Sequence, residues 1–81
     1  MSSLRRKFEE ELREKVNRSI RKTYGVQLEE DEMRLFLSGI ERRLRDHYFF
    51  IEELDSSSEI VIECVRHHLK DFGYELAASA L

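Results

Sequence analysis

Proline is absent from this 81-residue chain, glycine occurs only three times, and there is no tryptophan. With so few residues that favour tight β-turns, a fold built from short strands is disfavoured. The single cysteine, Cys64, excludes a disulfide within the chain and fits a reducing compartment. The chain also lacks the long apolar run of a membrane-spanning helix and the apolar region of a signal peptide. We therefore expect a cytoplasmic, unprocessed, all-α protein.

Charge is abundant, and it is distributed unevenly along the chain. Residues 1–25 hold eight Lys and Arg against four Glu, whereas residues 26–81 hold six against thirteen Asp and Glu. A chain of this length forms one domain and buries little more than about 60 % of the surface that its unfolded form exposes. We expect residues 1–81 to be a single helical domain that completes its small core by dimerisation.

The first predicted helix covers about residues 3–24 and carries an apolar residue at every fourth position. The row consists of Leu4, Phe8, Leu12, Val16 and Ile20. Four residues turn an α-helix by about 400°, so the row drifts and its two ends meet different surroundings. Such a row is typical of helices that cross their neighbours obliquely. Ser3 is the expected N-cap, Gly25 the left-handed residue at the end, and Val26 is expected to fold back toward Ile20.

A second helix is predicted over about residues 29–54, because the acidic run 29–32 suits the positive end of a helix. Its apolar residues alternate steps of four and three, which is a heptad seam. The seam consists of Met33, Leu37, Ile40, Leu44, His47, Ile51 and Leu54. A capping pattern over 38–41 leaves open a break at Ser38-Gly39, which would give a four-helix bundle. The heptad phase continues through Gly39, so a continuous helix is favoured.

A third helix is predicted over about residues 57–72. The pattern Ser56-x-x-Glu59 is a capping box at its start, and Gly73 is the expected left-handed residue after its end. The tail 74–81 is expected to be frayed or to form a short helical turn. The predicted fold is therefore a small three-helix bundle of the all-α class.

The run His47 to Ile51 is aromatic or apolar throughout. On a continuous helix these side chains would cover every direction around the axis, and two short companion helices would not bury them all. Aromatic residues commonly carry the binding energy of interfaces. We expect Tyr48, Phe49, Phe50 and Ile51 to bind a partner, either a second copy of this chain or another protein.

The basic half of the first helix offers a second reading. Four cations lie close together there: Lys15, Arg18, Arg21 and Lys22. They could follow a nucleic-acid backbone, although cations near a helix C-terminus also oppose its negative end and can pair with the acidic run 29–32. A nucleic-acid-associated regulator is thus the alternative function, with no membrane and no small-molecule substrate indicated.

Metal binding and nucleophilic catalysis find little support in the sequence. Cys64 and His68 are four residues apart, with His67 beside them, and two helical side chains at this spacing can share a metal. Zinc needs three or four ligands, and only His47 remains to join them. No orienting group accompanies the Cys64 thiol as a nucleophile. We therefore predict no metal, no cofactor and no catalytic residue.

Arg42 and His47 resemble the arginine–histidine motif of HEPN-type helical ribonucleases. The resemblance implies a helical fold in which the two side chains handle phosphate charge and protons during RNA cleavage. It covers two residues only, and five helical steps place them about 140° apart. RNA cleavage therefore ranks third, and the leading hypothesis is a non-enzymatic interaction, adaptor or regulatory protein.

Overall fold

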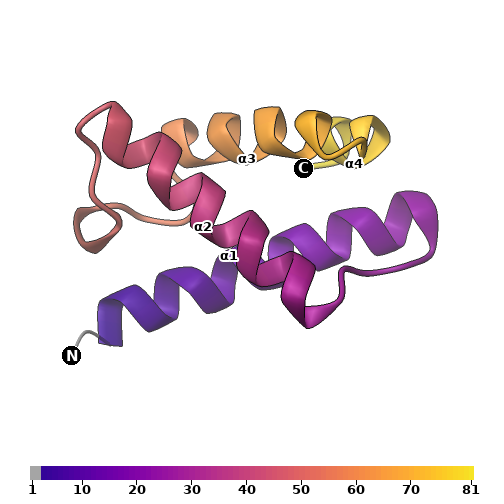
Figure 1. The fold of residues 1–81 in the computed structure, drawn as a ribbon, viewed down its shortest axis with the longest axis horizontal. Helices are drawn as coiled ribbons and strands as arrows, with labels where there is room; N and C mark the ends of the chain where they lie inside the picture. The colour runs from indigo at the N-terminus through magenta and orange to yellow at the C-terminus, as the bar shows by residue number, and fades with distance from the viewer. Residues whose placement is uncertain (1–2) are drawn as a thin grey trace.

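The computed structural model describes residues 3–81, and within that range the chain forms helices and no β-strand. The elements are α1 (Ser3–Tyr24), α2 (Glu30–Asp46), the 3₁₀ helix η1 (Ile51–Glu53), α3 (Glu59–Asp71) and α4 (Glu75–Ser79). The predicted all-α class is confirmed. Figure 1 shows α2 crossing α1 obliquely, and α3 packs between α2 and α4.

Helix α1 coincides with the predicted range and buries its apolar row. Phe8, Leu12, Val16 and Ile20 belong to the core, whereas Leu4 is 63 % exposed. The two ends of the row therefore meet different surroundings, as predicted, because α1 contacts η1, α2 and α4 in turn.

The end of α1 is set by Gly25, which has the predicted left-handed backbone with φ +73° and donates its N–H to the Arg21 carbonyl at 2.9 Å. The fold-back expected of Val26 is wrong, since Val26 is exposed and Leu28 is buried in its place. The capping role predicted for Ser3 concerns a side chain outside the described part of the structure.

Helix α2 begins close to the predicted position and passes through Gly39 without a break. The Glu29 N–H donates to Glu32 Oε1 at 3.0 Å, which satisfies one free donor at the helix start. Its buried face consists of Met33, Phe36, Ile40 and Leu44. The predicted heptad seam is thus wrong in part: Phe36 takes the core position expected of Leu37, and His47 is exposed.

The prediction that α2 extends to Leu54 is also wrong. The helix ends at Asp46, residues 47–50 form a turn and an extended strand-like link, and Ile51 begins η1. Ile51 is buried in the core. Its side chain reaches the core from η1, after the chain has left the path of α2.

Helix α3 starts two residues later than predicted, and the capping box at Ser56 is wrong. Ser56 is buried, and its hydroxyl donates to Glu11 Oε1 at 2.6 Å, so the side chain binds α1 instead of capping α3. Ser57 N–H donates to Asp55 Oδ1 at 2.9 Å, an Asx turn that redirects the chain before α3. The connection is therefore held by side chains of α1 and of its own turn.

The tail forms a real fourth helix, α4, which is why the bundle has four helices although α2 is unbroken. Ala77 and Ala78 are buried, and the Ser19 hydroxyl donates to the Ala77 carbonyl. The rings of Tyr24 and Tyr74 meet edge to face with centroids 5.3 Å apart. The tail thus completes the core against α1.

Gly39 allows α2 and α3 to approach closely. A Cβ atom built on Gly39 would lie 2.3 Å from His68 Nε2, which is far inside contact distance. The His68 ring is held in place by edge contacts with Phe36, at 4.9 Å between centroids, and by Phe72 at 5.1 Å. The glycine in the middle of α2 therefore makes room for a buried histidine.

His68 makes the stability of the fold depend on pH. Burial lowers the pKa of His68, the Arg43 charge lowers it further, and Asp71 opposes the shift. Below the ordinary histidine value of about 6.5, the unfolded chain takes up a proton that the folded chain resists, so stability falls as the pH falls. We expect the loss between about pH 7 and pH 5 to be smaller in His68→Gln, measured by urea unfolding at each pH.

The neighbouring exposed histidine provides the control for this pH dependence. His67→Gln makes the same chemical change at an exposed position of α3, so a reduced slope found only in His68→Gln assigns the effect to the buried ring. An unchanged slope in His68→Gln would assign the acid sensitivity to the carboxylates instead.

The described residues enclose a compact core. The Cα radius of gyration is 11.9 Å, against about 11.7 Å for a compact domain of this length. Sixteen hydrophobic residues of the described range are buried. None of the helices in this range has the length and apolar character needed to cross a membrane.

Candidate protein-binding site

The segment Tyr48–Phe50 links α2 to η1 at one end of the molecule, on the left in Figure 1. Tyr48 is 86 % exposed, Phe49 37 % and Phe50 47 %. We call these three residues the aromatic segment. Three adjacent aromatic side chains at the surface of a folded chain are unusual, because such rings are normally buried. Their exposure makes this end of the molecule the leading candidate site.

Tyr48 has a left-handed backbone, with φ +65°, and within residues 3–81 it is the only residue other than glycine with positive φ. Its N–H donates to the Arg45 carbonyl at 2.9 Å, and the Phe49 N–H donates to the Leu44 carbonyl at 2.8 Å. These two bonds form a Schellman motif, in which glycine is the usual left-handed residue. The left-handed region costs an L-residue about 1–2 kcal/mol. Tyr48 therefore occupies a position where glycine would be more stable.

The end of α3 shows the same motif with the usual residue. Gly73 has φ +89°, its N–H donates to the Lys70 carbonyl at 3.0 Å, and the Tyr74 N–H donates to the Leu69 carbonyl at 2.8 Å. The chain thus contains two matched helix ends that differ in the residue at the strained position. Since Tyr48 is mostly exposed, few contacts within the chain offset its strain.

Tyr48→Gly is expected to raise the free energy of unfolding by about 1 kcal/mol, because it removes the left-handed strain. Chemical denaturation at low protein concentration measures this change. Gly73→Ala at the matched end should lower stability by a similar amount, and Tyr48→Ala, which removes the ring but keeps the strain, should change it little. A destabilised Tyr48→Gly would show that the ring contributes to the fold.

A groove lies beside the aromatic segment, between the end of α2 and α3. Its volume is about 400 Å³. Its apolar lining includes Leu44, Phe49, Ile60 and Cys64, and its polar lining consists of Arg43, His47, Glu63 and His67. A smaller pocket of about 180 Å³ adjoins the other side and is lined by Phe49 and Phe50 together with residues of α1, α2 and η1. Phe49 therefore lines both the groove and the smaller pocket.

Ile51, the fourth residue predicted to bind a partner, contributes little exposed surface here. It is 3 % exposed and packs in the core. The sequence prediction assumed one continuous helix through these residues, whereas the change to η1 turns Ile51 inward and leaves the preceding rings outside.

Ion pairs hold α2 and η1, the elements on either side of the aromatic segment, to α1. Arg5 of α1 contacts Glu41 of α2 at 2.6 Å and Glu52 of η1 at 3.4 Å. Arg45 also contacts Glu41 at 2.7 Å. The hydrogen bond with Glu41 raises the pKa of Arg5. The aromatic segment is thus anchored at both ends by elements that are themselves tied to α1.

Cys64, His47 and His67 line the groove, but they do not form a metal site. No three His, Cys, Asp or Glu side chains between residues 3 and 81 are grouped so that they could hold a metal ion. His68, the ligand paired with Cys64 by spacing, faces Phe36 and Phe72. Burial raises the pKa of the Cys64 thiol, which keeps it protonated and weakly nucleophilic.

Arg42 and His47 both lie near the end of α2. Arg42 is exposed on the last turns of α2, and His47 caps the helix end. His47 Nδ1 lies 3.0 Å from the Arg43 carbonyl oxygen. The Nδ1 atom of the imidazole is therefore engaged with the backbone of its own helix.

The four cations of the alternative nucleic-acid site divide into two groups. Lys15, Arg18 and Lys22 line one pocket of about 220 Å³ beside α4. Arg21 instead donates to Gln27 Oε1 at 3.2 Å. Lys15 also donates to the Ser56 carbonyl at 3.1 Å.

The predicted pairing of these cations with the acidic run 29–32 is made by a different residue. Arg13 contacts Glu30 at 2.8 Å. Arg13 lies about three turns before the end of α1 and ahead of the basic cluster, so its position along the helix did not indicate this pairing. Only the return path of the chain after Gly25 brings Glu30 beside it.

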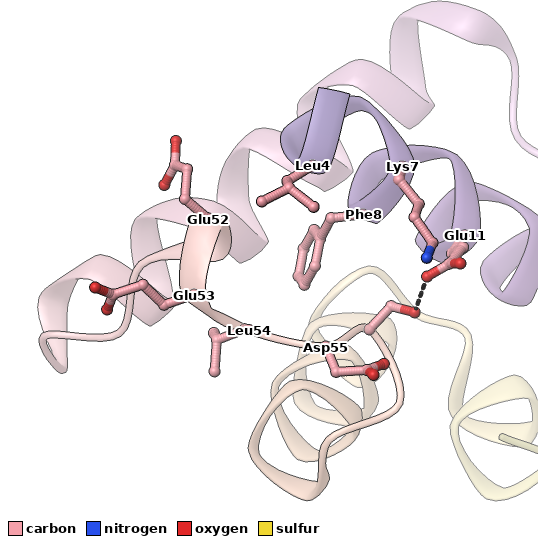
Figure 2. Close-up of a pocket in the computed structure, with 9 residues that line it drawn as sticks. Leu4, Lys7, Phe8, Glu11, Glu52, Glu53, Leu54 and Asp55 are labelled. Carbon is pink, nitrogen blue, oxygen red and sulfur yellow. Dashed lines mark hydrogen bonds between the residues drawn. The ribbon is translucent and has the colours of Figure 1, made fainter. Parts of the chain in front are cut away.

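A further pocket, of about 300 Å³, lies between the start of α1 and the η1 segment. Figure 2 shows Leu4 and Phe8 at its wall and the hydrogen bond to Glu11 across it. The carboxylates of Glu52, Glu53 and Asp55 point in different directions in this view, so they do not converge on one ligand position. The pocket therefore has acidic walls without a ligand cage.

Comparisons with protein-family models, with curated proteins and with solved structures found no match for this chain. Its function therefore has to be inferred from the chemistry of its own surfaces.

Proposed function

We propose that this chain is a non-enzymatic protein-binding module, an adaptor or regulator, whose contact residues are Tyr48, Phe49 and Phe50. The observation that carries the proposal is Tyr48: a bulky residue held at positive φ, with its ring 86 % exposed. Strained residues that gain nothing within the fold are concentrated at functional sites. Contacts between the exposed ring and a bound partner offset the strain of the left-handed Tyr48 backbone.

The size of the surface agrees with this role. With about 200 Å² for each aromatic side chain, the exposed fractions of the aromatic segment amount to roughly 340 Å². That area lies within the range of the largest apolar patch on a typical monomer, which is often functional. Tyrosine is enriched among interface hot spots, so Tyr48 is the residue expected to contribute most to binding.

The test uses the full chain as bait, with variants that leave the core intact. Tyr48→Ser and Phe50→Ser should each abolish capture of the partner that wild type retains from cells that express the protein. Leu35→Ser is the matched control, because Leu35 is an exposed apolar residue on α2, 68 % accessible, away from the aromatic segment. Capture that survives both aromatic substitutions, or that Leu35→Ser abolishes equally, would overturn the proposal.

A second candidate function, binding to a nucleic acid, rests on the pocket lined by Lys15, Arg18 and Lys22, which has no acidic side chain in its lining. Binding through phosphate contacts falls steeply with salt. Affinity for RNA or DNA that drops about tenfold or more between 50 and 200 mM salt, and that is lost on replacing these three residues, supports it. Salt-independent binding or none rejects it.

A further inference from the structure

We propose that the partner is a second copy of this chain, bound about a two-fold axis that passes through the aromatic segment. This inference rests on the proposed function and names the occupant of its surface. Three features support it: the small area of the rings, the order of the charges on either side of them, and the groove beside Phe49.

The rings alone are too small for a stable interface. They expose roughly 340 Å², whereas each partner in a standard interface contributes about 800 Å². A stable complex must therefore also cover the flanking surfaces, which are the last turn of α2 and η1. Any partner has to match the charges of both.

The two flanking surfaces carry opposite charges. Near the end of α2 the exposed Arg42 is basic and in η1 the exposed Glu53 is acidic, whereas Arg43, Arg45 and Glu52 pair within the chain with Asp71, Glu41 and Arg5. Figure 1 shows the end of α2 and η1 at opposite ends of the aromatic segment, one above the other at the left of the molecule. A partner must present acidic groups at one end and basic groups at the other.

A second copy turned by a two-fold axis has these charges in the required order. The rotation places the basic end of α2 on η1 of the other copy, and the same contact occurs a second time by symmetry. In a two-fold interface the same patch serves both subunits, so the complex closes at two chains. Opposite charges at the rim of the interface favour this orientation, in which the end of α2 faces η1 of the other copy. They disfavour an orientation in which α2 faces α2 and η1 faces η1, because like charges would then meet.

The groove between α2 and α3 gives the exposed Tyr48 ring a position in the other copy. Phe49, next to the axis, forms one wall of the groove, and Leu44, Ile60 and Cys64 supply apolar contacts. A volume of about 400 Å³ is open to receive the ring. Each copy thus offers one protruding ring and one apolar groove.

The first experiment measures the mass of the wild type by light scattering and sedimentation across a concentration series. We expect a dimer at ~100 μM, well above the dissociation constant of an ordinary stable interface. Tyr48→Gly should dissociate at least about 100-fold more readily, as expected of a hot-spot residue. The double variant Phe49→Asp/Phe50→Asp should be monomeric with its helical circular dichroism retained.

The second experiment tests the orientation through exposed charges. Arg42 and Glu53 are exposed and take part in no ion pair among the described residues. Arg42→Glu alone and Glu53→Arg alone should each weaken the dimer about tenfold, because each creates two like-charge contacts. An equimolar mixture of the two variants should restore association, since every contact across that heterodimer joins opposite charges.

The outcomes separate this inference from the proposed function. A wild type that is monomeric at ~100 μM overturns the second-copy proposal, while partner capture through Tyr48 would still stand. A dimer that Tyr48→Gly leaves intact, or charge variants that do not recover on mixing, overturns the two-fold arrangement. Unfolding does not confuse the result, because Tyr48→Gly is expected to be more stable as a monomer.

Discussion

Phe36→Ala is expected to lower the free energy of unfolding by about 3–5 kcal/mol, the usual cost of removing a buried phenylalanine. Phe36 is fully buried, and its ring contacts His68 and Phe72 where α2 meets α3. A domain of this length has a total stability of about 4–12 kcal/mol. The variant should therefore be partly unfolded at 37 °C, as measured by urea and thermal denaturation.

Leu37→Ala is the matched control for this prediction, because Leu37 is the neighbour that the heptad pattern places in the core. Leu37 is only partly buried and packs at the edge of the core. Its replacement should cost about 1 kcal/mol, in proportion to the smaller apolar area removed from water. Equal losses at the two positions would favour the heptad seam over the face that the structure buries.

Gly39→Ala is expected to destabilise the protein by about 2 kcal/mol, although alanine is a better helix former than glycine by about 1 kcal/mol. The added methyl group would lie 2.3 Å from His68 Nε2. The His68 ring cannot move away freely, because it is buried against Phe36 and Phe72. Steric overpacking therefore outweighs the gain in helix propensity.

A double-mutant cycle measures this clash directly. In a His68→Ala background the ring is gone, so Gly39→Ala should become neutral or stabilising. Ser38→Ala, at the exposed neighbouring position of α2, should change stability by less than about 0.5 kcal/mol in either background. A Gly39→Ala single variant more stable than wild type would show that α2 and α3 separate at little cost.

The helix ends marked by glycine could be predicted from sequence, and the end without glycine could not. Gly25 and Gly73 each take a left-handed backbone after a helix, as expected. At Tyr48 the local pattern gives no stop signal, since the apolar spacing of α2 continues through Ile51. The helix ends there because Ile51 reaches the core from η1, which is a tertiary effect that spacing along one helix does not report.

The exposure of aromatic side chains at residues 48–50 could be predicted from sequence, but their geometry could not, and their binding to a partner stays a prediction. Five consecutive aromatic or apolar residues could not all be buried by two short helices, and Tyr48, Phe49 and Phe50 are exposed. The continuous helix assumed for these residues was wrong, because the rings belong to a non-helical link and Ile51 belongs to the core. The groove beside Phe49 depends on how α2 and α3 pack, so no pattern within either helix indicated it.

Helix α4 has a consequence for the order in which the chain folds. Five residues are too few to form a stable helix alone. Helix α4 is held to α1 by hydrogen bonds that the Ser19 hydroxyl donates to the Ala77 carbonyl and the Leu76 N–H donates to the Tyr24 hydroxyl oxygen. These contacts join positions 58 and 52 residues apart in the chain. Closing this long loop costs chain entropy, so we expect α4 to join α1 after it has packed on the adjacent α3, and its amide hydrogens to exchange when α1 detaches.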